Sequence, residues 1–184
     1  MDVATADRFF ALMTLAALTG VFAAAALATA GRFSAAAARA RHGLWQALDG
    51  PALWLAWLIA TGSMLGSLYY SEIVHYAPCS LCWYQRIAGY PLVAILLIAA
   101  VRRDRNVRVY ALPLVLIGGL IAAYQYLLGY LPTTEILGCS IDVSCTERYI
   151  WEFGFVDFPF MSLVSFAAIG CLLWCSSTRP GDGT

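Results

Sequence analysis

The residues best suited to chemistry lie in one short segment, 77–92, which reads APCSLCWYQRIAGYPL. Two cysteines separated by two residues can form or exchange a disulfide. If a helix begins at Pro78, then Cys79, Cys82 and Arg86 lie at i, i+3 and i+7 on one face. A helix N-terminus and a guanidinium both favour a thiolate over a thiol. The segment therefore predicts an activated cysteine beside a fixed positive charge.

The position of Arg86 suggests what this dithiol would react with. An arginine at or just inside a bilayer surface is costly and is a functional candidate. A quinone is a lipid-soluble acceptor whose carbonyl oxygens a guanidinium can bind. Cys82 would lie nearer this acceptor, and Cys79 nearer the water. The structural alternative for Arg86 is a side chain that snorkels to the interface.

A second pair, Cys139 and Cys145, has five residues between its members. One interpretation is a structural staple, because a disulfide stabilises a long loop. The functional interpretation is a shuttle disulfide on an exposed loop. A soluble partner's thiolate would attack it, and its reduced form would pass electrons to Cys79 and Cys82.

An aromatic segment, 147–160, follows the second pair and reads ERYIWEFGFVDFPF. Aromatic residues at this density predict an interfacial belt or a helix lying on the membrane, and either would hold the loop within reach of Cys79. Glu147, Arg148 and Glu152 are interpreted as a solvated face.

The elements that must position these residues are membrane helices. The 184-residue chain is 61% hydrophobic and 12% charged, with zero net charge and a mean hydropathy of +0.74. This composition predicts an integral membrane protein and gives no basic face for nucleic acid. Five apolar runs are long enough to cross about 30 Å of hydrocarbon as helices: 9–30, 52–71, 83–101, 109–131 and 159–175. A cleaved signal peptide is the alternative for the first run, although its flanking charges do not fit one.

The arginine distribution predicts the orientation. Eight arginines and three acidic residues lie on one side of a five-span arrangement, against three arginines and eight acidic residues on the other. The positive-inside rule puts the arginine-rich side in the cytoplasm. The N-terminus and both cysteine pairs then lie outside, where disulfides persist. Cys171 and Cys175, towards the cytoplasmic end of the last span, are expected to act as small apolar residues.

Three other functions are possible for these residues. A metal-binding or transport protein could use Cys79 and Cys82 as ligands, although only His75 lies near enough in sequence to add to them. A structural membrane protein could carry two inert disulfides. An enzyme that carries reducing power outward would have to depend on Cys171 and Cys175.

The segment PCSLCWYQRIAGYPL resembles the signature of the DsbB/BdbC family of membrane disulfide-bond formation proteins. The matching positions are Pro78, Cys79, Cys82, Trp83, Tyr84, Gln85, Arg86 and Pro91. The later segment CSIDVSCTERYIWEFGFVDFPFMSLVSF also resembles this family, particularly its BdbC branch, so the resemblance covers roughly 52–175.

The resemblance implies an all-α, polytopic four-helix membrane bundle in a bacterial cell membrane. It also implies that the protein reoxidises a soluble, DsbA-like oxidase of thioredoxin fold and reduces a quinone, either ubiquinone or menaquinone. By motif position, Cys79 and Cys82 would be the quinone-coupled pair. Cys82 would interact with the quinone, and Arg86 would line its site. Cys139 would form the mixed disulfide with the partner, which Cys145 would resolve.

Two features depart from the family pattern. The second pair is more compact than in better-known members, which leaves the order of exchange open. The chain also has one additional N-terminal transmembrane helix. We therefore expect this helix and a basic cytoplasmic linker in 1–51, the DsbB-like four-helix domain in 52–176 and a cytoplasmic tail in 177–184.

Overall fold

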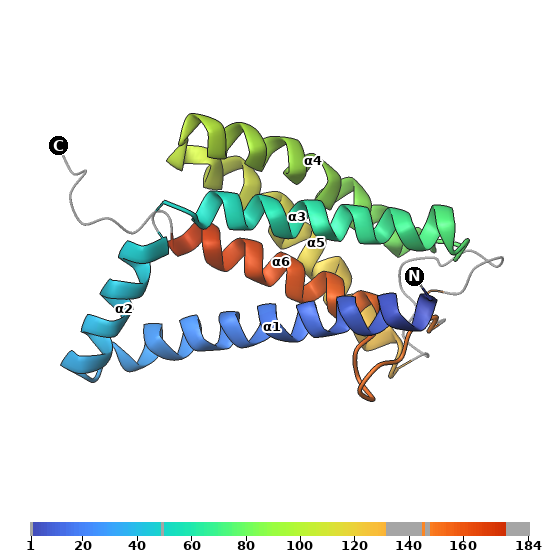
Figure 1. The fold of residues 1–184 in the computed structure, drawn as a ribbon, viewed down its shortest axis with the longest axis horizontal. Helices are drawn as coiled ribbons and strands as arrows, with labels where there is room; N and C mark the ends of the chain where they lie inside the picture. Colours follow the sequence, from blue (N-terminus) through green and yellow to red (C-terminus); the bar gives the residue numbers. More distant parts are fainter. Residues whose placement is uncertain (1, 49, 132–144, 146–147, 176–184) are drawn as a thin grey trace.

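The computed structural model is an assembly of long helices (Figure 1). It describes residues 2–48, 50–131, 145 and 148–175. Cys139 and Glu147, which the sequence singled out, lie outside these residues. The described ranges contain no β-strand, apart from one isolated bridge between Glu152 and Val156. The prediction of an all-α protein is confirmed.

Four helices form the central bundle: α3 (Ala52–Leu68), α4 (Ser80–Arg102), α5 (Arg108–Leu128) and α6 (Phe158–Cys175). Helix α3 packs against α4 and α6, and α5 packs against the same two helices, so the four close into a ring. The interior is apolar and includes Leu92, Leu96, Val115, Phe166, Ile169 and Leu173. Because lipid is itself apolar, close packing of such side chains must hold the bundle together.

Helix α1 (Val3–Ala30) runs along the outside of this bundle and packs against α6 (Figure 1). It is followed by α2 (Ala35–Leu48), which crosses the end of the bundle. The sequence predicted a basic linker where α2 lies. This helix is only 14 residues long and is interrupted by Arg39, Arg41 and His42, so it carries no long apolar run that a search for membrane spans would detect.

Within the described ranges, five helices are long and apolar enough to cross a membrane, which agrees with the five predicted spans. Their ends differ from the prediction by a few residues. Helix α1 begins at Val3, α4 begins at Ser80, and α5 ends at Leu128. A π-helical turn, η1 (Tyr69–Ile73), extends α3, and a short 3₁₀ turn, η2 (Arg105–Val107), joins α4 to α5. These ends were missed because capping and turn geometry, rather than hydropathy, decide where a helix stops.

Candidate active site

Cys79 and Cys82 lie at the N-terminal end of α4, with their Sγ atoms 2.8 Å apart. Cys79 is the N-cap residue and has an extended backbone. Its Sγ accepts a hydrogen bond from the backbone N–H of Cys82 at 3.4 Å. Helix α4 begins at Ser80, so Pro78 precedes the helix instead of occupying its first turn. The spacing still brings the two sulfur atoms together, as the sequence predicted.

The two cysteines have different surroundings. Cys79 is buried in a cluster with Leu81, Leu128 and Cys145, whereas Cys82 is half-buried and lines a large cavity. The pKa of Cys79 is raised, first by its hydrogen bond with Cys82 and then by burial, which disfavours a thiolate. Cys79 therefore lies beside Cys145 of the second pair, and the expectation that it lies nearer the water than Cys82 stays a prediction.

A buried pair of glutamines connects the cysteines. Gln125 of α5 directs its Nε2 towards Cys79 Sγ at 3.2 Å, Cys82 Sγ at 3.5 Å and the backbone oxygen of Cys145 at 3.4 Å. Its Oε1 accepts a hydrogen bond from Gln85 Nε2 at 2.6 Å. A buried amide needs hydrogen-bond partners, and here the partners are the cysteines themselves. One side chain thus contacts both members of the first pair and one member of the second.

Cys145 is buried, with 3% of its surface exposed, and it is disulfide-bonded. Cys79 and Cys82 are free thiols. The expectation of an exposed disulfide is therefore wrong for Cys145, whose burial against Leu128 follows from its place beside the end of α5. Such burial shields this sulfur from attack by a soluble protein.

Arg148 fixes the backbone after Cys145 to the end of α5. Its Nη2 donates a hydrogen bond to the Gly129 carbonyl at 2.7 Å. Its guanidinium lies 4.1 Å from the centre of the Trp151 ring and 4.8 Å from that of Tyr130. Arg148 is exposed, which agrees with its interpretation as part of a solvated face, and its contacts with two aromatic rings and a carbonyl add a structural role.

Residues 148–157 of the aromatic segment form no helix, and the segment enters α6 at Phe158. It turns back on itself through a bridge between Glu152 and Val156, with Phe153 and Gly154 at positive φ. Asp157 then accepts a hydrogen bond from the Phe160 N–H at 3.0 Å, near the start of α6. Burial raises the pKa of this carboxyl group. The turn allows the chain to reverse direction before it re-enters the bundle.

Tyr149 brings this segment towards the first cysteine pair. Its ring stacks on Tyr76 with 4.6 Å between ring centres. Its hydroxyl donates a hydrogen bond to the Ala77 carbonyl at 3.5 Å, two residues before Cys79. These contacts join the segment after Cys145 to the segment before Cys79, as the sequence led us to expect for this loop.

A cavity of about 530 Å³ opens beside Cys82. Its lining comes mainly from α1, α3, α4 and α6, with Gln125 from α5 and a few residues of η1 and the connecting segments, and is mostly apolar. Cys82 and Arg86 both line it. A volume of this size is ordinary for a small-molecule site, typically about 300–1,000 Å³. The Cys82 thiol and the Arg86 guanidinium thus border the same space.

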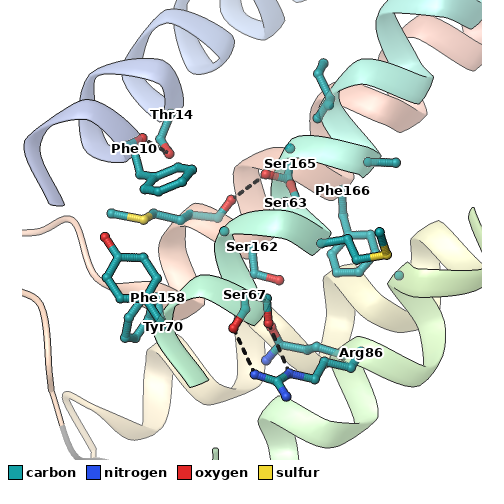
Figure 2. A pocket seen from close by; sticks show the side chains of 18 of the residues that line it. Phe10, Thr14, Ser63, Ser67, Tyr70, Arg86, Phe158, Ser162, Ser165 and Phe166 are labelled. Carbon is teal, nitrogen blue, oxygen red and sulfur yellow. Dashed lines mark hydrogen bonds between the residues drawn. The ribbon is translucent and has the colours of Figure 1, made fainter. Parts of the chain in front are cut away.

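Arg86 is held at the wall of this cavity by α3 (Figure 2). Its Nε donates to Ser67 Oγ at 3.0 Å, and its Nη2 donates to the Ser67 carbonyl at 3.1 Å. The guanidinium also lies 5.2 Å from the centre of the Trp83 ring. Among the described residues, Nη1 has no hydrogen-bond partner. The contact with Ser67 orients the cation and leaves donor capacity for a bound molecule.

Cys171 and Cys175 lie on α6, and neither lines the cavity beside Cys82. In the part of the chain that the structure describes, no group of three or more histidine, cysteine or acidic side chains could hold a metal ion.

The fold and the site define a polytopic helical membrane protein with a dithiol at a helix N-terminus. A family model described as disulfide bond formation protein DsbB matches residues 50–176. The chain therefore belongs to the DsbB family, and its role lies in disulfide-bond formation at a membrane.

Similar proteins carry matching names. The chain is 49% identical over 125 residues to "Probable disulfide formation protein C 2" of Bacillus anthracis, covering 68% of this chain and 89% of that protein. It is 46% identical over 118 residues to "Disulfide bond formation protein C" of Bacillus subtilis, covering 64% and 86%. It is also 46% identical over 123 residues to "Probable disulfide formation protein" of Chlamydia trachomatis, covering 66% and 88%. No solved structure matches the chain significantly.

The sequence reasoning missed two residues of the site. Gln125 received no role, although a glutamine inside an apolar span is itself a signal. Ser67 likewise received none, because a single serine in a membrane helix commonly bonds its own backbone. Only the packing of α3 and α5 against α4 reveals their partners.

Proposed function

We propose that this protein is a quinone-dependent thiol–disulfide oxidoreductase of a bacterial cell membrane. It reoxidises a soluble, extracytoplasmic DsbA-like oxidase and delivers the electrons to ubiquinone or menaquinone. The observation that supports this proposal most strongly is the order in which the second cysteine pair, the first cysteine pair and the cavity adjoin one another. Cys145 shares a buried cluster with Cys79, Gln125 contacts both, and Cys82 faces the cavity that contains Arg86.

The first exchange is between proteins. A thiolate of the reduced partner attacks Sγ of Cys139, the Cys139–Cys145 bond breaks, and a mixed disulfide forms. The partner's second thiolate then attacks this mixed disulfide, so the partner leaves oxidised and Cys139 and Cys145 are left as two thiols. The burial of Cys145 supports attack at Cys139 rather than at Cys145.

The second exchange is internal. A thiolate of the reduced second pair attacks the disulfide of Cys79 and Cys82, and its partner cysteine completes the exchange. The second pair becomes a disulfide again, while Cys79 and Cys82 take up the two electrons and two protons. The buried cluster that holds Cys79 and Cys145 supports Cys79 as the sulfur attacked. Cys82 is then the leaving sulfur that develops negative charge, and Gln125 Nε2, 3.5 Å from it, can donate a hydrogen bond to it.

The cavity residues fit a quinone. Its apolar walls suit a ring and the start of an isoprenoid tail, and Arg86 can donate a hydrogen bond to a carbonyl oxygen. A bound quinone supplies the final acceptor, because its reduction to a quinol takes up two electrons and two protons. Cys82 lines the same cavity and would be the thiol that faces it.

The test is partner-driven reduction of quinone by the purified full chain in lipid vesicles. A reduced DsbA-type oxidase is the electron donor, and decylubiquinone and a menaquinone analogue are compared as acceptors. We expect Cys82→Ser to abolish reduction. Arg86→Ala should lower kcat/KM about 10- to 100-fold, as expected for one lost hydrogen bond from a charged group.

Arg102→Ala is the matched control, because Arg102 is an exposed arginine at the other end of α4. It should leave reduction unchanged. If the wild-type chain reduces neither acceptor although its partner is fully reduced, the proposed electron path is wrong. The cysteines would then be structural or would bind a metal.

A further inference from the structure

Helix α1 lies outside the family match, which begins at residue 50, yet it lines the cavity beside Cys82. Phe10, Met13, Thr14 and Ala17 all contribute to the lining. Their spacing places them on one face of the helix. Figure 2 shows Phe10 and Thr14 on α1 across the cavity from Arg86 on α4. Without α1, this wall of the cavity would be open to lipid.

Three contacts hold α1 against the end of α3 and the adjoining turn η1. The Tyr70 hydroxyl donates a hydrogen bond to Asp7 Oδ1 at 2.7 Å. The Phe10 ring packs on the backbone at Gly66, where an added β-carbon would lie 3.0 Å from the ring. Phe10 also contacts the Tyr70 ring, with 5.8 Å between ring centres. A buried tyrosine bonded to a carboxylate is a specific interaction, unlike general packing in lipid.

The same end of α3 also holds Arg86. Ser67, which accepts two hydrogen bonds from Arg86, precedes Tyr70 by three residues and follows Gly66 directly. Helix α3 therefore fixes the cationic wall on α4 and the apolar wall on α1 relative to each other. The π-helical turn η1 begins at Tyr69, beside these contacts, and such turns frequently occur at functional sites.

The face that α1 presents is apolar in character. The Thr14 hydroxyl donates to the Phe10 carbonyl of its own helix at 2.8 Å, so its hydrogen-bond donor is already used. Phe10 and Met13 add an aromatic ring and a flexible thioether. Such groups bind a flat apolar ring or an isoprenoid chain by packing, and a methionine adapts to its shape.

We propose that α1 is the fifth wall of the quinone site and that Phe10 and Met13 contact the bound quinone. Asp7 and Tyr70 hold α1 in position through their hydrogen bond. This inference rests on the proposed function, because it names the residues that complete the same cavity. Helix α1 would thus increase the affinity for quinone beyond that of the four-helix domain alone.

The test measures equilibrium binding of decylubiquinone to the purified full chain, followed by quenching of its tryptophan fluorescence. Phe10→Ala and Met13→Ala should each raise the Kd on the order of tenfold, because each removes apolar contact area. Phe22→Ala and Leu12→Ala are matched controls on α1, since both side chains are exposed and neither lines the cavity. The controls should keep the wild-type Kd.

A second measurement shows that the variants are folded. The chain with both disulfides formed should oxidise reduced partner in a single turnover without added quinone, and Phe10→Ala should do so at the wild-type rate. Asp7→Ala and Tyr70→Phe should each raise the Kd for decylubiquinone, and the double variant should raise it no further, because both remove one hydrogen bond.

The outcomes separate the two proposals. If the wild-type chain does not bind decylubiquinone, the proposed function fails. If it binds and the Kd is the same in Phe10→Ala and Met13→Ala, the role of α1 is wrong while the proposed function stands. If Phe22→Ala and Leu12→Ala raised the Kd for decylubiquinone as much as Phe10→Ala and Met13→Ala do, the proposed role of α1 would also be wrong. The effect would then be general to the helix and not specific to the cavity lining.

Discussion

Gln125 is the residue on which the two cysteine pairs converge. Its amide contacts Cys79, Cys82 and the backbone of Cys145, and Gln85 orients it from α4. It is 5% exposed, so water does not compete for these contacts. We interpret Gln125 as a positioning residue, which holds the cysteines in register and acts through them.

Replacing Gln125 by leucine should slow the exchange between the two pairs. The single variant should also lose about 1–3 kcal/mol of stability, because it leaves the Gln85 amide buried without its partner. Changing both Gln85 and Gln125 to leucine should recover much of that stability, yet the exchange should stay slow. The measurements are the rate of partner oxidation in rapid mixing and the thermal unfolding midpoint.

Gln46→Leu serves as the control, since Gln46 is exposed on α2 at the far end of the molecule. A double variant that recovers both stability and exchange rate would show that Gln125 only fills space.

At the scale of the elements, the bundle depends on a close approach between α5 and α6. The Phe166 ring of α6 lies directly on Gly118 of α5, where a β-carbon would overlap it. The ring also lies near Gly89 of α4, at 3.5 Å from the position of an added β-carbon. Small residues at helix contacts are the usual means of close packing in a membrane.

Gly118→Ala should therefore destabilise the bundle by about 1–3 kcal/mol, because the added methyl group overpacks the contact with Phe166. Gly119→Ala is the matched comparison on the adjacent residue, where the new β-carbon would meet Phe166 Cβ at an ordinary 3.6 Å. It should be neutral or slightly stabilising, since alanine favours a helix. The check is thermal unfolding of both variants in the same detergent, and equal midpoints would contradict the packing argument.

At the scale of the whole molecule, the two ends differ in charge and in chemistry. The start of α1, the cysteine pair on α4 and the segment around Tyr149 meet at one end, through the contacts of Asp7 with Tyr70 and of Tyr149 with Ala77. The connection from α1 to α2 and the turn η2 lie at the opposite end (Figure 1). The charge bias predicts that this second end faces the cytoplasm.

Labelling of introduced cysteines in intact cells tests this orientation. A membrane-impermeant maleimide should label Thr5→Cys in intact cells, because Thr5 is exposed near the start of α1. It should label Ser34→Cys, exposed between α1 and α2, only after the membrane is permeabilised. Labelling of the parent chain gives the background, and the reverse pattern would mean that the arginine bias does not set the orientation.

Features that follow local rules could be predicted from the amino-acid sequence. Long apolar runs must become helices in a bilayer, because their backbone groups have no other partner there, so the number of spans was predictable. The approach of Cys79 to Cys82 was also predictable, since a helical turn brings residues three apart onto one face. The ends of the helices and the whole of α2 could not be predicted, because these parts of the sequence carry no strong hydrophobic pattern.

The surroundings of the dithiol depend on tertiary packing. The contacts of Gln125 with Cys79, of Ser67 with Arg86 and of Asp7 with Tyr70 join residues on different helices. No local pattern specifies such pairs, because they depend on how helices rotate and pack against one another. The burial of Cys145 and the cavity between α1 and α3 arise in the same way. The thiol chemistry could therefore be predicted from the one segment that contains Cys79 and Cys82. The residues that contact these cysteines could be identified only from the packing of the helices.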